Sequence, residues 1–573
     1  MCVKSPVAVP IAGWIRGYER SWLGRDVIAG LTVWGLIVPE GMAYAGLAGL
    51  PPQAGLYTIL VTLLAYAVFG TSRHLMVAAT SATAALVGSS VAALRPADAA
   101  AYAGAAAALV LTVGALFLLA GFAKMGFVAQ FLSRPVTEGF VFGLAVFVAV
   151  GQLNKLFGVS KGEGNTFRKL WHVIAELGDA NWWAFGIGAL ALVGLFGLPH
   201  LSRRLPAGLV VLGGAIALSG AMDLAGRRNV EVVGTLPKGL PSFSLPDVGL
   251  GSLWVLIPAA AGIVLVAYSE ALGVAESFAT RHGYEIDPNQ ELLAFGAANL
   301  ASGVFGGLVA CGGMSSTAVN DGGGARSQVS GLVATVAAFV TVIVLTPLFK
   351  NLPEAVLGAL IIHAVSHMMS VAKLKAVLRV SPVEFWLGVT ALVGVVALDV
   401  LQGLLIAMGA SLLLVIYKSS RASVTELGEL PGKPGTFGAL DRNPGATTRE
   451  GVLLFRLDAP LYYANAASNR DAFKAAVTGA APAVRTVVFS PEVQHELDVT
   501  SLEMMTDLIE WMHGRGIDVW FTHLHRDLLS ESERLGLVAL VGAEHIAADI
   551  TDALARLDRR PPPASGQAAE PDQ

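Results

Sequence analysis

Residues 257–272 read IPAAAGIVLVAYSEAL, part of an apolar stretch long enough to cross a bilayer, with one acid, Glu270, inside it. An unpaired charge in hydrocarbon is costly, so an acid in such a place indicates a function. A second acid, Glu40, interrupts the apolar stretch 28–50 directly after Pro39, a residue that bends helices. The alternative is that each acid lies at a helix end and reaches water. Two intramembrane acids favour a transport pathway.

The composition is typical of a polytopic membrane protein. Of 573 residues, 54% are hydrophobic and 14% charged, whereas an ordinary soluble domain has about 25% charged residues. The net charge is −4 and no basic run occurs, so nucleic acid is not an expected partner. The two cysteines, Cys2 and Cys311, and the scattered histidines match no metal or redox motif. We therefore expect no cofactor, no metal ion and no enzymatic activity.

Apolar stretches recur between residues 26 and 418, about fourteen in all, several of them shorter than a full span. If the N-terminus lies inside, more basic residues fall in cytoplasmic turns than in outer ones, in agreement with the positive-inside bias. An even number of spans then places both termini in the cytoplasm. We expect a cytoplasmic segment 1–25 followed by a transmembrane domain 26–418 in the cytoplasmic (inner) membrane.

The chain changes character after residue 418. Residues 419–450 are rich in Ser, Thr, Gly and Pro and are predicted to be a linker. Short β-rich runs followed by helical stretches predict a small α/β domain over 451–560, and the polar end 561–573 is predicted to be disordered. The predicted strands are 451–457, 485–489 and 518–522, and the predicted helices are 500–513 and 525–535.

The two halves of the membrane domain carry the same pattern. Glu40 is followed two spans later by small hydroxylated residues around Ser81, and Glu270 is followed in the same way by a cluster around Ser315. Transporters built from inverted repeats bind anions between broken helices, whose free N–H groups carry partial positive charge. Two facing helix starts would thus bind an anion without Lys or Arg. Alternatively, these hydroxyls only bond to their own backbone or to neighbouring helices.

An ionised carboxylate repels a nearby anion, so protonation of Glu270 would favour anion binding and couple the two movements. No phosphate-binding loop of the G-x-x-x-x-G-K-[ST] type occurs in the chain. An ion gradient, rather than ATP, is the expected source of energy.

At these positions the chain resembles the sulfate permease (SulP) family of anion transporters, which carry a STAS domain at the C-terminus. The resemblance covers nearly the whole chain. The segments that carry it are DVIAGLTV (26–33), PEGMAYA (39–45), GTSRH (70–74), DPNQEL (287–292) and TAVN (317–320).

The resemblance implies about fourteen spans in a 7+7 inverted repeat, with a core domain that rocks against a gate domain, usually in a homodimer. It further implies that Glu270 takes part in ion coupling, and that Thr500 in the STAS domain sits where related domains can carry a phosphorylatable hydroxyl. Glu40 is the second candidate for ion coupling because of its own place inside an apolar stretch. The alternative for Thr500 is a plain helix N-cap, since Thr500 and Glu503 have the spacing of a capping box. The implied substrate-binding residues are Tyr44, Thr80, Ser81, Ala82, Ser315, Ser316 and Thr317.

Three positions depart from the family pattern. Glu40 stands where the family often has glutamine, residues 78–79 are Ala-Ala where many members have Gly-Pro, and Ser316 stands where many have arginine. The missing positive charge could be replaced by a co-transported cation or by a proton on Glu40 or Glu270.

The expected function is secondary active transport of a small anion, sulfate first, in symport with protons by alternating access. One alternative is sodium-coupled symport of bicarbonate, in which Glu270, Ser315 and Thr317 would offer oxygen ligands to sodium. Further alternatives are a dicarboxylate transporter, an anion channel and an anion sensor.

Overall fold

The computed structural model of the protein describes residues 14–559 except 16, 128–132, 163, 202–206, 236–238, 241–242, 244–245, 247–249, 399 and 481–483. The chain forms two compact units that divide between Ser411 and Leu412. Most of the expected N-terminal segment 1–25 and the whole expected tail 561–573 lie outside the described residues.

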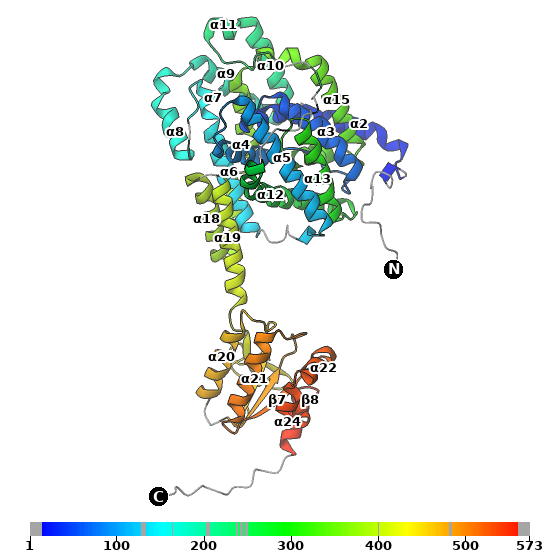
Figure 1. The fold of residues 1–573 in the computed structure, drawn as a ribbon, viewed down its shortest axis with the longest axis vertical. Coiled ribbons are helices and arrows are strands. Elements are labelled where there is room, and N and C mark those ends of the chain that lie inside the picture. The colour runs from blue at the N-terminus through cyan, green and yellow to red at the C-terminus, as the bar shows by residue number, and fades with distance from the viewer. Residues whose placement is uncertain are drawn as a thin grey trace. The chain divides into compact units, whose positions relative to one another are not determined.

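The first unit is almost entirely helical (Figure 1). Among the described residues, eight helices are long and apolar enough to cross a membrane. Its main helices are α2 (Leu23–Leu47), α3 (Gln53–Phe69), α4 (Ser81–Ala93), α5 (Ala99–Phe122), α6 (Arg134–Gly151), α7 (Leu153–Phe157), α8 (Thr166–Ala175), α9 (Trp182–Leu201), α10 (Ala207–Met222), α11 (Leu224–Arg228), α12 (Leu250–His282), α13 (Pro288–Val304), α14 (Met314–Gly322), α15 (Val329–Val340), α16 (Glu354–Ser366), α17 (Val371–Val380) and α18 (Pro382–Ala397). Helix α19 (Val400–Ser419) extends across the division between the units.

The order of elements repeats, as the predicted fold class requires. A long helix, a shorter helix, a three-residue strand and a half-helix follow one another twice, first as α2, α3, β1 (Val77–Ala79) and α4, then as α12, α13, β2 (Ala310–Gly312) and α14. The two sets are interleaved, since α13 packs on both α3 and α5, and α15 packs on α2. Figure 1 shows α3, α5 and α13 beside one another. The predicted 7+7 helical architecture is confirmed.

Close helix packing rests on glycine. A Cβ atom on Gly55 in α3 would overlap the carbonyl oxygen of Gly41 in α2, and one on Gly139 in α6 would overlap that of Gly388 in α18. Only residues without a side chain allow backbones to approach so closely.

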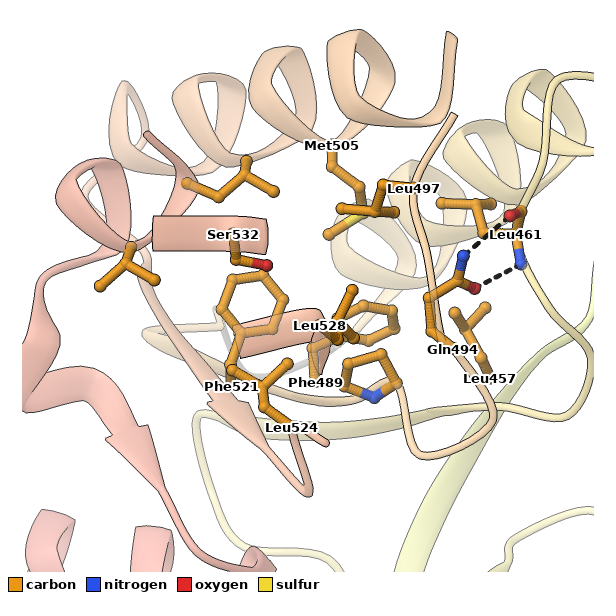
Figure 2. A pocket seen from close by; sticks show the side chains of 13 residues that line it. Leu457, Leu461, Phe489, Gln494, Leu497, Met505, Phe521, Leu524, Leu528 and Ser532 are labelled. Carbon is orange, nitrogen blue, oxygen red and sulfur yellow. Dashed lines mark hydrogen bonds between the residues drawn. The ribbon is translucent and has the colours of Figure 1, made fainter. Parts of the chain in front are cut away.

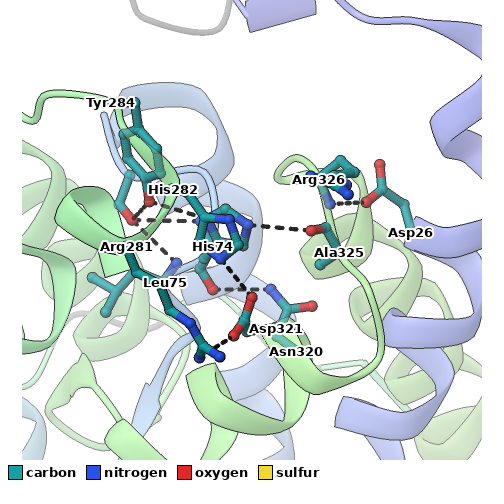
Figure 3. A network of polar contacts seen from close by, with 11 residues as sticks. Asp26, His74, Leu75, Arg281, His282, Tyr284, Asn320, Asp321, Ala325 and Arg326 are labelled. Carbon is teal, nitrogen blue, oxygen red and sulfur yellow. Dashed lines mark hydrogen bonds and ion pairs between the residues drawn. The ribbon is translucent and has the colours of Figure 1, made fainter. Parts of the chain in front are cut away.

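Polar contacts tie the loop between α3 and β1 to the second repeat (Figure 3). The ring of His74 lies between the Tyr284 hydroxyl, 3.1 Å from Nδ1, and the Ala325 carbonyl oxygen, 3.2 Å from Nε2. Asp321 at the end of α14 accepts from both Arg281 (2.7 Å) and His282 (2.6 Å) at the end of α12. These contacts join the segment that leads into β1 to the segments that follow α12 and α14, and join the end of α14 to the end of α12.

The second unit is the predicted small α/β domain. Its six-stranded sheet has the order β4-β3-β5-β6-β7-β8, in which β5, β6, β7 and β8 are parallel and β3 and β4 are antiparallel. The strands are β3 (Val424–Glu429), β4 (Phe437–Ala439), β5 (Val452–Leu457), β6 (Thr486–Ser490), β7 (Asp518–Thr522) and β8 (Ile546–Ala547), and the helices are α20 (Ala466–Gly479), α21 (Val499–His513), α22 (Arg526–Arg534), α23 (Leu537–Val541) and α24 (Ile550–Asp558).

Alternation along the strands supplies two cores. Phe455, Phe489 and Phe521 point to the face covered by α20 and α21, whereas Leu454 and Trp520 point to the face covered by α24. The first core contains a cavity of about 30 Å³ lined mostly by apolar side chains, together with Gln494 and Ser532 (Figure 2). That volume holds roughly one water molecule, so the cavity is a packing gap.

The predicted linker 419–450 needs correction, because it contains β3 and β4. Leu427 in β3 is 2% exposed and packs in the second core. The Gly and Pro residues that indicated a linker instead form the turn 431–435, in which Gly432 and Gly435 both have φ of +73°. Positive φ favours glycine in a tight turn between strands.

The N-cap interpretation of Thr500 is wrong. Asp498 is the N-cap of α21: its Oδ1 accepts from the Ser501 N–H at 2.7 Å and its Oδ2 from the Tyr463 N–H at 2.6 Å. Burial disfavours the ionised carboxylate, but these hydrogen bonds outweigh burial and lower the pKa of Asp498. Thr500 is the second helical residue and is exposed.

Candidate functional site

Two half-helices begin at one short β ladder. Strands β1 and β2 pair antiparallel, with Val77 opposite Gly312 and Ala79 opposite Ala310. Helix α4 starts directly after β1 and α14 directly after β2. Because the strands are antiparallel, the two half-helices leave the ladder at opposite ends. The two clusters predicted from the sequence, around Ser81 and Ser315, are therefore brought together by backbone pairing.

The first half-helix is capped by Thr80. Its side-chain oxygen accepts from the Thr83 N–H at 3.3 Å, and the Thr83 hydroxyl accepts in turn from the Thr80 N–H at 3.1 Å. This reciprocal capping box satisfies one helix N–H group. The N–H groups of Ser81 and Ala82 come before the first N–H group that bonds back into the helix, which is that of Ala84 to the Thr80 carbonyl oxygen. Within the described part of the chain no acceptor contacts them.

The second half-helix has no side-chain cap. Its N-cap is Gly313, and the first N–H group to bond back into the helix is that of Thr317, at 3.1 Å from the Gly313 carbonyl oxygen. Among the described residues, none accepts a hydrogen bond from the N–H groups of Met314, Ser315 or Ser316. Unpaired N–H groups at a helix start carry partial positive charge and bind anions. The second helix start thus offers more free donors than the first.

The two helix starts are neighbours. The Thr80 hydroxyl oxygen lies 3.9 Å from Cys311 Sγ in β2. A Cβ atom on Gly313 would lie 3.8 Å from the Thr80 methyl group and 2.8 Å from the Ser316 hydroxyl. A glycine N-cap therefore leaves the backbone of the second start open between these two side chains.

Glu270 lies beside this arrangement, and neither predicted acid has a basic partner among the described residues. Glu270 in α12 is half-buried, with the thiol of Cys311 3.8 Å from its Oε2. Glu40 in α2 is also half-buried, and Tyr44, one turn further on, is buried. Among the described residues no ion pair includes either acid.

Most of the predicted hydroxyl groups already have partners. Thr317 is fully buried and accepts from the Met76 N–H at 3.1 Å, Ser81 donates to Met368 Sδ at 3.2 Å, and Ser316 donates to the Gly313 carbonyl at 3.2 Å. Ala82 is 1% exposed, whereas Ser315 is exposed. The donors left over for a ligand are mainly backbone N–H groups.

Two neighbours of the site were not predicted from the sequence. Cys311 contacts both Thr80 and Glu270, and Met368, after α16, contacts Ser81. Cys311 lies in the same short run as Ser315, which was a usable signal. Nothing in the sequence near Met368 indicates that it reaches the first repeat.

Two broken helices that start at one ladder, in a multi-pass helical unit with an acid beside them, are features of membrane transporters built from inverted repeats. The chain belongs to the sulfate permease family. The sequence model of that family matches residues 23–391, and the STAS domain model matches residues 443–553. The family consists of transporters, not enzymes, and this chain is a multi-pass membrane protein that transports a small anion.

Comparisons with individual proteins agree. The chain is 33% identical over 556 residues to a probable sulfate transporter of Mycobacterium tuberculosis, covering 96% of this chain and 99% of that protein. The structure of the murine solute carrier 26 family member A9 anion transporter in the inward-facing state superposes with a TM-score of 0.89 at 23% identity, covering 96% and 94%. The transmembrane domain of the cyanobacterial bicarbonate transporter BicA gives 0.61 at 21% identity, covering 69% and 98%.

Proposed function

We propose that the protein is a secondary active transporter that carries sulfate together with protons across the cytoplasmic membrane by alternating access. The observation that carries the proposal is the pair of helix starts at the β1–β2 ladder, with Glu270 next to Cys311 in that ladder. The name of the Mycobacterium tuberculosis relative, a probable sulfate transporter, supports sulfate as the anion.

The anion is held by backbone N–H groups in this proposal. Those of Ser81 and Ala82 and of Met314, Ser315 and Ser316 face it from two sides, with the Thr80 cap and the Tyr44 hydroxyl nearby. An ionised Glu270 would repel the anion strongly in a low-dielectric site. A proton on Glu270 removes that repulsion, so proton and anion bind together. Glu40 is the second group available for the same purpose.

The supporting architecture is proposed as follows. Both termini lie in the cytoplasm, α2 to α5 and α12 to α15 form the core domain, the remaining helices form the gate domain, and the protein is a homodimer. In support, α13 packs on α5 within the first group and α18 packs on α6 within the second. The bond between Ser81 and Met368 links a core half-helix to a gate element and would have to break when the core moves.

The proposal is tested by uptake of radiolabelled sulfate into proteoliposomes under an inward proton gradient or an inward sodium gradient. We expect proton-stimulated uptake by the unaltered protein and loss of the stimulation in Glu270→Gln. The matched control is Glu276→Gln, the same change on the exposed face of the same helix, which should retain it. Proton-stimulated sulfate uptake that survives in Glu270→Gln would contradict the assigned coupling role.

The main competitor, sodium-coupled bicarbonate symport, fits the geometry less well. That mechanism requires Thr317 as an oxygen ligand to sodium, but the Thr317 hydroxyl is fully buried and accepts a hydrogen bond from the Met76 N–H. In the uptake experiment, sodium-driven bicarbonate or dicarboxylate flux without sulfate flux would favour these substrates. Anion binding without flux would favour a sensor, and flux that does not saturate would favour a channel.

Thr500 is proposed as a phosphorylation site of the STAS domain. Its hydroxyl is exposed in the first turn of α21, where the helix start favours a phosphate and the neighbouring Asp498 carboxylate opposes it. Phosphopeptide mass spectrometry of protein from its native host should detect the modification. Complete peptide coverage with no phosphorylated form under all growth conditions would refute it.

A further inference from the structure

A cavity with both polar and apolar lining lies away from the half-helix starts, at the end of the membrane unit where α2 stops. Its volume is about 640 Å³, within the roughly 300–1,000 Å³ common for ligand pockets. Helix α4 has 13 residues between its start at the anion site and Pro96 at this cavity, a distance of roughly 20 Å. The lining includes Gly46, Asp98, Tyr102, Lys155, Glu354 and Leu357.

One ion pair spans the gate side of this cavity. Lys155 Nζ lies 2.6 Å from Glu354 Oε2, and the two side chains are only 21% and 23% exposed. Lys155 is in the last turn of α7 and Glu354 is the first residue of α16. Of the described residues that line the cavity, Lys155 is the one basic side chain.

The ammonium group also reaches the core side. A Cβ atom on Gly46, near the end of α2, would lie 3.1 Å from Lys155 Nζ. On the same side, the Asp98 carboxylate is engaged as the N-cap of α5, where it accepts from the Ala101 N–H at 2.8 Å. Lys155 is thus the cavity residue to which an anion can bind, provided that the anion replaces Glu354 as the partner of the ammonium group.

We propose that Lys155 binds the incoming anion at this cavity, and that Glu354 pairs with the Lys155 ammonium until the anion replaces the Glu354 carboxylate. The inference rests on the proposed function. In the proposed orientation α2 ends at the outer surface, so the capture site faces outward. While Lys155 and Glu354 are paired, their opposite charges cancel and the empty cavity has only a weak electrostatic field. The flexible side chain of lysine lets the ammonium group move with a bound anion. Because Lys155 touches α2, exchange of its partner also releases a contact between gate and core.

A purely structural ion pair predicts something different. If Lys155 and Glu354 only hold α7 against α16, neutralising either one removes the same interaction, and both variants should change transport in the same direction. A capture site predicts opposite directions. Loss of Lys155 removes the anion's partner, whereas loss of Glu354 removes the anion's competitor.

The test measures the apparent KM for sulfate from each side, in whole cells of a host without its own sulfate uptake and in inverted vesicles. We expect Lys155→Gln to raise the outer KM about tenfold and Glu354→Gln to lower it about threefold, as for charges that steer and hold a ligand. The inner KM should stay within about twofold in both variants. Lys155→Arg keeps the charge and should stay near the unaltered protein, and Lys350→Gln, which removes an exposed positive charge close to α16, is the matched control.

Salt dependence gives a second readout. The outer KM of the unaltered protein should rise with ionic strength, and that slope should flatten in Lys155→Gln only. Shifts of both neutralised variants in one direction, or an outer KM in Lys155→Gln equal to that of the unaltered protein, would overturn the inference while leaving the proposed function intact. Failure of the unaltered protein to transport sulfate would instead overturn the proposed function, and the inference with it.

Discussion

Gly55 shows how far a single residue decides packing in this protein. A Cβ atom at this position would overlap the carbonyl oxygen of Gly41 and lie 3.0 Å from the Met42 nitrogen. Both are backbone atoms, which cannot move away without a shift of the helix. We expect Gly55→Ala to destabilise the membrane unit by about 1–3 kcal/mol, as overpacking does. Thermal unfolding in detergent measures it. Gly104→Ala in α5, where a Cβ atom meets nothing within 4 Å, is the control and should unfold at or above the unaltered temperature.

Glu291 is a buried acid with a structural role. It is 0% exposed and accepts from the Tyr66 hydroxyl (2.7 Å), the Thr71 N–H (2.8 Å) and the Thr71 hydroxyl (2.6 Å). Glu291→Ala would leave the buried Tyr66 hydroxyl and the two donors of half-buried Thr71 without their partner, so we expect a loss of about 3 kcal/mol in stability. Glu285→Ala, at an exposed position in the preceding loop, should change the unfolding temperature little. Equal unfolding temperatures for the two variants would contradict this assignment.

At the scale of elements, the start of α21 makes the STAS domain sensitive to acid. The folded pKa of Asp498 lies below its unfolded value, because hydrogen bonds from Ser501 and Tyr463 outweigh burial. The stabilisation from Asp498 is therefore present above the unfolded pKa of about 3.9 and is lost as the pH falls through the folded pKa. We expect Asp498→Ala to cost about 1 kcal/mol at pH 7 and progressively less below pH 4.

Urea unfolding of the isolated STAS domain at pH 7 and pH 3 measures this effect. Asp507→Ala, which removes an exposed acid on the same helix, serves as the control. The difference in unfolding free energy between this variant and the unaltered domain should be the same at both pH values. A cost of Asp498→Ala that does not change with pH would show that the carboxylate charge contributes nothing.

The whole molecule consists of two units with separate hydrophobic cores. We therefore expect a fragment 420–559 to fold alone and to unfold cooperatively in urea. A fragment that begins at residue 443, where the STAS family match begins, lacks β3 and β4 and exposes the edge of β5. It should aggregate or unfold at lower urea. Equal stability of the two fragments would show that β3 and β4 add nothing to the domain.

The sequence by itself determined the class, the repeat and the positions of the half-helix starts. Long apolar stretches, intramembrane acids and clusters of small residues are local signals, because the bilayer requires each span to satisfy its own backbone. The strands β5, β6 and β7 and the helix α21 were likewise predicted from local alternation and periodicity.

Only the tertiary structure decided which groups meet. The pairing of β1 with β2 joins residues more than two hundred positions apart, and with it come the neighbouring helix starts and the contact of Cys311 with Glu270. Thr317 turns away to Met76, Asp498 replaces Thr500 as the cap, and Lys155 pairs with Glu354. The partners of Thr317 and Lys155, and the Tyr463 N–H group that Asp498 binds besides its local bond to Ser501, are distant in the chain. Local sequence carries no information about which distant group will satisfy a given hydrogen bond or charge.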